Sequence, residues 1–83
     1  MNAVGIDVSK GKSMVAIMRP LGEVVAAPFE VGHTATELNE LAKFILKISG
    51  ETRVVMEYTG VYFEPIATAL YDAGLCVCVV HAQ

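Results

Sequence analysis

The chain has 83 residues, of which 54% are hydrophobic and 18% are charged, and its formal net charge is −3. This length accommodates one small domain with one core and excludes a second domain. Charged residues interrupt the apolar stretches before any reaches the ~20 residues of a membrane-spanning helix, and the N-terminus has no basic region leading into a long apolar core, so we expect no membrane segment, no secretion signal and a cytoplasmic location.

Three strands are predicted in the first part of the chain, over residues 3–9, 12–19 and 22–31. The short breaks between them, KGK and PLG, contain the Gly and Pro residues that are typical of hairpin turns. We therefore expect these strands to form an antiparallel meander.

A helix is predicted over residues 34–50. Thr34 and Glu37 have the spacing of a capping box, and Gly50 can end the helix. The inward stripe of this helix is expected to contain Leu38, Leu41, Phe44, Ile45 and Ile48.

Two strands flank a second predicted helix in the last part of the chain. TRVVME at 52–57 is β-branched and apolar, which is typical of a fully buried strand. FEPIATALYDAG at 63–74 indicates a helix with Pro65 in its first turn and Ile66, Ala69, Leu70 and Ala73 facing inward. LCVCVV at 75–80 is predicted as the fifth strand.

The resulting order β-β-β-α-β-α-β predicts an α/β fold whose later strands run parallel, because helices connect them. Right-handed crossovers put both helices on one face of the sheet if the strand order is 3-2-1-4-5. The first, fourth and fifth strands are nevertheless apolar at consecutive positions, as in strands buried on both faces. We therefore expect the second face to drive self-association into a homodimer or higher oligomer.

Asp7 is unusual because it interrupts the apolar strand VGIDVSK at 4–10. Burying an unpaired carboxylate is costly, so the strand needs a compensating partner. In the predicted strand order Glu57 ends the neighbouring strand, and the two carboxylates meet at the carboxyl edge of the sheet. A divalent cation, most naturally Mg²⁺, would relieve their repulsion. The residues leave another interpretation open, in which Asp7 caps a turn or pairs with Lys10 or Lys12 while Glu57 is a solvated strand end.

Several other polar residues have simple structural explanations. Lys10 could approach a phosphate, but lysines are routine in short turns. Thr59 and Gly60 could present backbone N–H groups to a phosphate or hold the loop after Glu57, or Thr59 could be a plain helix N-cap. His33 is expected to be a surface or capping residue without a Ser or Cys partner.

Cys76 and Cys78 lie two positions apart in the last strand, so strand geometry points them to one face and not into a disulfide. Together with His81 they could suggest a metal. The four-ligand spacings of zinc sites are absent, so we interpret the cysteines as core residues of a protein from a reducing compartment.

The ordered set VGIDVSK and VVMEYTGVYFEPIATALYDAGLCVCVV resembles the amino-terminal domain of the insertion-sequence-110 type transposases, the DEDD or Piv-like DNA recombinases. The resemblance covers nearly the whole chain. It implies a ribonuclease H-like fold of the RuvC branch, here a single partial domain over residues 1–83 with the final helix missing. It also implies a bacterial or archaeal protein.

By this resemblance, Asp7 and Glu57 match the first Asp and the Glu of the acidic tetrad that binds divalent metal, Mg²⁺ or Mn²⁺, at the DNA phosphate. The two remaining aspartates lie beyond the fifth strand in the family, so we expect weak metal binding and no activity from this chain alone. The implied partners of the full-length protein are DNA and a guide non-coding RNA.

Two other classes of protein remain as alternatives. Actin-like or sugar-kinase-type ATPases open with a similar strand, but their first turn usually has Gly, Ser or Thr after the Asp, where this chain has Val8. A non-catalytic dimerisation module is the third possibility. The net charge of −3 argues against non-specific nucleic-acid binding by this segment, but it does not argue against a nuclease, whose metal site is acidic.

Overall fold

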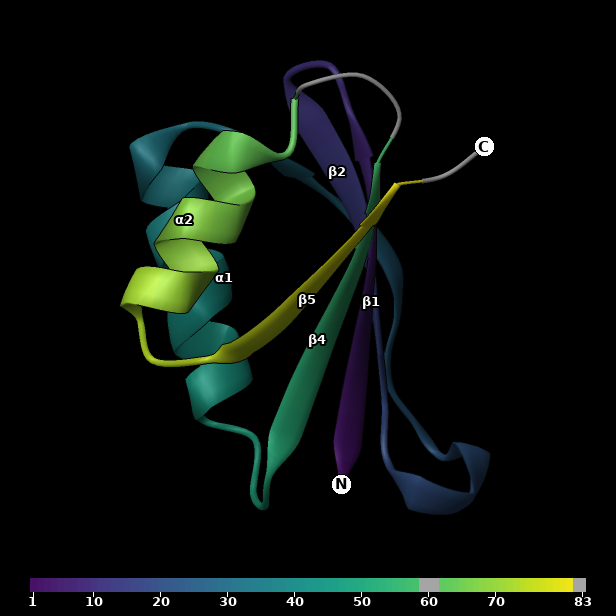
Figure 1. Cartoon of the computed structure of the whole chain (residues 1–83). Coiled ribbons are helices and arrows are strands. Elements are labelled where there is room, and N and C mark those ends of the chain that lie inside the picture. The colour runs from purple at the N-terminus through teal and green to yellow at the C-terminus, as the bar shows by residue number, and fades with distance from the viewer. Residues whose placement is uncertain (59–61, 82–83) are drawn as a thin grey trace.

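Five strands form one mixed sheet in the computed structural model, which describes residues 1–58 and 62–81 (Figure 1). The strands are β1 (Asn2–Ser9), β2 (Lys12–Met18), β3 (Val24–Gly32), β4 (Thr52–Tyr58) and β5 (Cys76–His81). Their order is β3-β2-β1-β4-β5, with β2 antiparallel to β1 and β3, and β4 parallel to β1 and β5. The predicted strand order and directions are confirmed.

The connection between β2 and β3 differs from the predicted hairpin. A short 3-10 turn, η1 (Pro20–Gly22), precedes β3, which therefore begins at Val24 and not at residue 22. Leu21 and Gly22 both have a positive φ, 67° and 79°, so the chain reverses through left-handed backbone before the strand can start. The pairing of β2 with β3 is irregular between Val15 and Met18.

The first helix, α1 (Ala35–Leu46), starts at the predicted cap. Thr34 Oγ1 accepts a hydrogen bond from the backbone N–H of Glu37 at 3.2 Å. The Glu37 carboxylate accepts from the backbone N–H of Gly32, so it ties the end of β3 to the first turn of the helix. A Cβ on Gly32 would lie 2.6 Å from that carboxylate, so a larger residue here would require the Glu37 side chain to shift and would disturb this hydrogen bond.

The end and the inward face of α1 were predicted only in part. The helix ends at Leu46, with Lys47 as its C-cap, and not at Gly50. Its buried residues are Leu38, Leu41, Ala42 and Ile45. Phe44 is 43% exposed, and its ring packs edge-on against Phe29 with the ring centroids 6.2 Å apart.

The second helix, α2 (Glu64–Asp72), has Phe63 at its N-cap position and Pro65 in its first turn. Ile66 and Leu70 are fully buried, and Gly74, with φ 92°, turns the chain towards β5. Ala69 and Ala73 are half-buried against the core. Among the described residues, neither of the two α-helices, α1 and α2, is long and apolar enough to cross a membrane.

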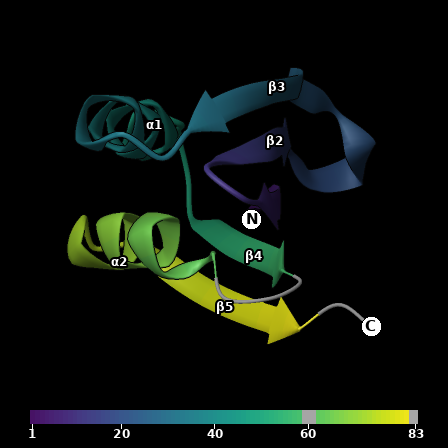
Figure 2. The ribbon, with the colours of Figure 1, turned by 90° about the horizontal axis from the view of Figure 1, so that it is seen from above.

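Both helices cover the same face of the sheet, as predicted (Figure 2). The core lies between this face and the helices, and side chains alternate strictly along β1, where Val4, Ile6 and Val8 are buried and their neighbours are exposed. The expectation that β4 is buried on both sides is wrong, because Arg53, Val55 and Glu57 are exposed. Within residues 1–58 and 62–81, no element covers the face of the sheet opposite the helices, which we call the open face.

Candidate metal site on the open face

Asp7 and Glu57 lie side by side on the two central parallel strands. The register of β1 and β4 pairs Asp7 with Glu57, Gly5 with Val55 and Ile6 with Met56. Residues paired in a parallel ladder point to the same face, and adjacent strands are about 4.8 Å apart. Ile6 and Met56 are buried under the helices, so the exposed Asp7 and Glu57 both belong to the open face, near the carboxyl ends of their strands.

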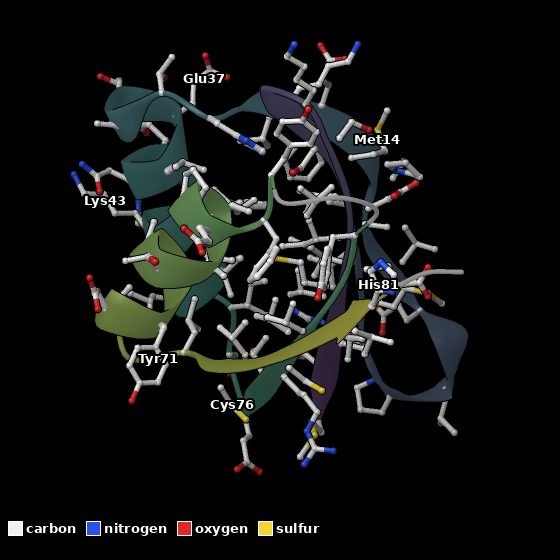
Figure 3. The ribbon with its side chains drawn as sticks, turned by 45° about the horizontal axis from the view of Figure 1, so that its top comes forward. Met14, Glu37, Lys43, Tyr71, Cys76 and His81 are labelled. Atoms are coloured by element: carbon white, nitrogen blue, oxygen red, sulfur yellow. The ribbon has the colours of Figure 1, made fainter. Side chains whose placement is uncertain are left out.

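The two carboxylates border a shallow hollow of about 340 Å³ in the open face. Its floor is low because Gly5 and Ala16 are small, and a Cβ on Gly5 would meet no atom within 4 Å. Met14, which pairs with Asp7 across β1 and β2, and Val55 form apolar walls. Figure 3 shows Met14 on the opposite side of the sheet from Lys43 and Tyr71 of the helices. The hollow is open enough for a large ligand to reach both carboxylates.

Within residues 1–58 and 62–81, no Lys, Arg or His side chain pairs with the Asp7 carboxylate at 4 Å or less. Lys12 Nζ instead lies 3.3 Å from Glu30 Oε1, and both of these side chains are exposed. The alternative in which Asp7 pairs with Lys10 or Lys12 is therefore wrong. Asp7 is not a turn-capping residue either, since it lies inside β1 and not at its end. Both carboxylates are exposed.

The donor set fits a hard divalent cation that keeps several of its waters. Two exposed carboxylates on neighbouring strands provide oxygen ligands of the kind Mg²⁺ binds, with room for waters and a phosphate. Over residues 1–58 and 62–81, no cluster of three or more His, Cys, Asp or Glu residues could complete a metal site. Asp7 and Glu57 are therefore the carboxylates that this part of the open face could offer to a cation.

The three other predicted site residues are less informative. Lys10 is exposed in the turn between β1 and β2, at the same edge of the sheet as Asp7 and Glu57. Thr59 and Gly60 lie outside the described residues. The simpler interpretation of Thr59 as the N-cap of α2 is wrong, because Phe63 occupies that position.

Aromatic contacts hold the two ends of the loop that follows Glu57. Tyr58, the next residue, is half-buried, and its ring lies 4.2 Å from that of Phe63 and 5.1 Å from that of His81, measured between centroids. These contacts join the ends of β4 and β5 to the start of α2. They fix the position of the strand end that carries Glu57.

The expectation that His33 has no Ser or Cys partner is wrong, because His33 pairs with Ser13. Ser13 is 2% exposed on β2, and its Oγ lies 2.8 Å from His33 Nε2. Burial lowers the pKa of His33, and the nearby Glu37 carboxylate opposes part of this shift. The position of Ser13, in alternation with the buried Val15 and Ile17, was the available signal, since a buried hydroxyl requires a partner.

Cys76 and Cys78 are free thiols on one side of β5, as predicted. They pair with Arg53 and Val55 of β4, which places them on the open face. Their interpretation as core residues is wrong because they are exposed.

Comparisons with solved structures identify the fold. The chain matches Thermus thermophilus RuvC with a TM-score of 0.63 and 15% identity, and T. thermophilus RuvC in complex with a Holliday junction substrate with a TM-score of 0.60 and 12% identity. In both cases the match covers 98% of this chain and 64% of the RuvC chain. The Aquifex aeolicus PPX-GPPA enzyme matches with a TM-score of 0.52 and 15% identity, over 98% of this chain and 36% of that one.

These likenesses, together with the strand order and the two helices on one face, show a ribonuclease H-like fold of the RuvC type. The chain spans 64% of the length of the RuvC chains it matches. No curated protein sequence matches it.

A family model described as a transposase, that of the insertion-sequence-110 DEDD type, matches residues 4–83. The match includes both Asp7 and Glu57 and nearly the whole chain. It favours the transposase interpretation over an ATPase or a dimerisation module, and the chain belongs to the insertion-sequence-110 type DEDD transposase family.

Proposed function

We propose that this chain forms part of the catalytic domain of a DNA transposase, in which Asp7 and Glu57 supply two carboxylate ligands to a divalent metal site. The observation that supports this most strongly is their equivalent register on adjacent parallel strands, exposed and without a neutralising side chain within the described residues. Like charges at neighbouring exposed positions cost stability and are typical of cation sites.

The proposed chemistry is metal-assisted cleavage and rejoining of DNA strands. A bound Mg²⁺ or Mn²⁺ would supply positive charge to the oxygens of the scissile phosphodiester. Asp7 and Glu57 would hold and orient the cation through their carboxylate oxygens. The low floor of the hollow at Gly5 and Ala16 leaves space for a phosphodiester above the two carboxylates.

DNA is the proposed substrate, and the RuvC complex with a Holliday junction substrate supports this class of partner by likeness of fold. The chain has six Lys and Arg residues against nine Asp and Glu residues, so it has little positive charge for DNA binding. Lys10, at the same sheet edge, is proposed to contact a phosphate, and Thr59 and Gly60 to position the loop after Glu57. Binding of a guide RNA is proposed for full-length family members.

Two protein carboxylates recover little of the hydration free energy that Mg²⁺ loses on binding. We therefore expect the chain by itself to bind metal weakly and to cleave no DNA. Experiments on this chain can therefore test the proposed metal site, but not DNA cleavage.

Paramagnetic Mn²⁺ provides the test, because it broadens the NMR signals of nearby amides. We expect broadening centred on residues 6–8 and 56–58, and its loss in Asp7→Asn and in Glu57→Gln. Glu40→Gln is the matched control, because Glu40 is an exposed carboxylate on α1, in the helix layer. Broadening centred on Glu30, Glu37 and Glu40, or unchanged in Asp7→Asn, would refute the proposed site.

A further inference from the structure

His33 joins the turn between β1 and β2 to the junction of β3 and α1. It follows β3 and directly precedes the N-cap residue Thr34. Its backbone N–H donates to the Gly11 carbonyl at 3.1 Å, and its Nε2 lies 2.8 Å from Ser13 Oγ. Figure 1 shows the turn and the start of α1 at the same end of the sheet, where β1 and β4 finish. One residue therefore contacts the start of the β2 hairpin twice, through its backbone and through its ring.

The turn has little else that ties it to the helix layer. Lys10, Gly11 and Lys12 are all exposed, so the turn contributes no buried side chain of its own. Ser13 is the first buried residue after the turn, at 2% exposed, and its hydroxyl contacts the His33 ring. A buried hydroxyl needs a hydrogen-bond partner, so this contact is favoured in the folded chain.

Glu37 is the charged group that acts on the His33 ring. It lies in the first turn of α1, and its carboxylate already accepts from the Gly32 N–H and from the Thr34 hydroxyl. It can therefore attract an imidazolium only in competition with the helix cap. Burial disfavours the charged ring more than this carboxylate favours it, so the pKa of His33 lies below its usual value. The neutral ring is the form that the folded chain accommodates better.

The neighbouring elements carry other charged side chains. Lys12 of β2 and Glu30 of β3 pair with each other at 3.3 Å, on the face of the sheet opposite Ser13. Glu64, at the start of α2, lines the groove between the two helices. Within residues 1–58 and 62–81, the hydrogen bond of the His33 ring is the one to Ser13.

We propose that the neutral His33 ring is a proton-sensitive latch that holds the turn between β1 and β2 against the junction of β3 and α1. A protonated ring places its charge beside a buried hydroxyl, so it is drawn instead towards water or Glu37. The contact with Ser13 then weakens, and the turn keeps only its backbone pairing. The consequence for the site rests on the proposed function, because the latch positions Lys10, the proposed phosphate contact. His33 is thus a positioning residue that acts through Ser13 and Gly11.

Amide hydrogen exchange and backbone relaxation, both measured by NMR on the unmodified chain, test the latch. The reporter is the amide of residue 33, which donates to Gly11, and Lys10 reports the motion of the turn. Between about pH 7.5 and about pH 5, the protection factor of residue 33 should fall several-fold relative to that of the core residue Ile6, and Lys10 should become more mobile. Constant relative protection and mobility across this range overturn the inference.

Three variants separate the latch from a general effect of acid. His33→Gln keeps a neutral group that can reach the Ser13 hydroxyl, so residue 33 should stay protected at both pH values. Ser13→Ala removes the contact, so the turn should be mobile at both. His81→Gln replaces the other histidine of the chain and should behave like wild type.

A pH response that survives in His33→Gln, or that disappears in His81→Gln, would assign the effect to another group and overturn the latch. The readouts need neither metal nor DNA, so a failure of the latch and a failure of the proposed metal site are distinguishable. Only the second is reported by the Mn²⁺ broadening around Asp7 and Glu57.

Discussion

Asp7 on β1 and Glu57 on β4 are direct neighbours in a parallel ladder, on the face of the sheet that the helices leave open. Their two negative charges are brought together by the backbone register and not by any side-chain contact. The buried Ile6 and Met56 anchor the two strands on the opposite face, so the backbone positions that carry the two carboxylates are fixed relative to each other.

Removing either carboxylate should not destabilise the fold. Asp7 and Glu57 are exposed, so Asp7→Asn or Glu57→Gln should change the free energy of unfolding by no more than ~0.5 kcal/mol, with relief of repulsion favouring the variant. Ile17→Ala, at a fully buried position, should instead lose ~2–5 kcal/mol. Urea denaturation of the three variants provides the comparison. A loss above ~2 kcal/mol in Asp7→Asn would mean that Asp7 has a structural role.

Metal affinity should reflect the small number of ligands. We expect Mg²⁺ to bind in the millimolar range or more weakly, and binding should be lost in Asp7→Asn. Calorimetric titration at constant ionic strength measures this. Tight stoichiometric binding would contradict a two-carboxylate site, and so would DNA cleavage by this chain.

The fold and the central pair could be predicted from sequence because they follow from local patterns and from the handedness of crossovers. Strand alternation, the caps at Thr34 and Gly74, and the helical connections suffice to place β1 beside β4. Asp7 stands out because it interrupts an apolar strand, and the predicted strand order then points to Glu57.

What could not be predicted depends on contacts between distant residues. The Ser13–His33 hydrogen bond joins residues 20 apart, and no spacing rule anticipates it. The connection after α1 is held by Asn2, whose Nδ2 donates to the Ser49 carbonyl at 2.8 Å, a contact between residues 47 apart. Consecutive apolar residues in β4 and β5 indicated burial on both sides, but hydrophobicity does not reveal whether a covering layer is present.

Asn2 should contribute measurably to stability. It is 3% exposed, and its Nδ2 also lies 3.3 Å from Thr52 Oγ1, so it joins β1 to the connection between α1 and β4. Asn2→Ala should cost ~1–3 kcal/mol, because the Ser49 carbonyl loses its donor. Thermal and urea unfolding measure this loss. An unchanged midpoint would show that water replaces the amide without cost.

His33 should make the stability depend on pH. Its pKa is lower in the folded chain than the usual ~6.5, because burial disfavours the charged imidazole. The unfolded chain therefore takes up the proton first, and stability should fall as the pH drops below ~6.5 until the folded pKa is passed. Urea unfolding across this range should show a smaller loss for His33→Gln than for wild type. Identical profiles would exclude His33 as the source.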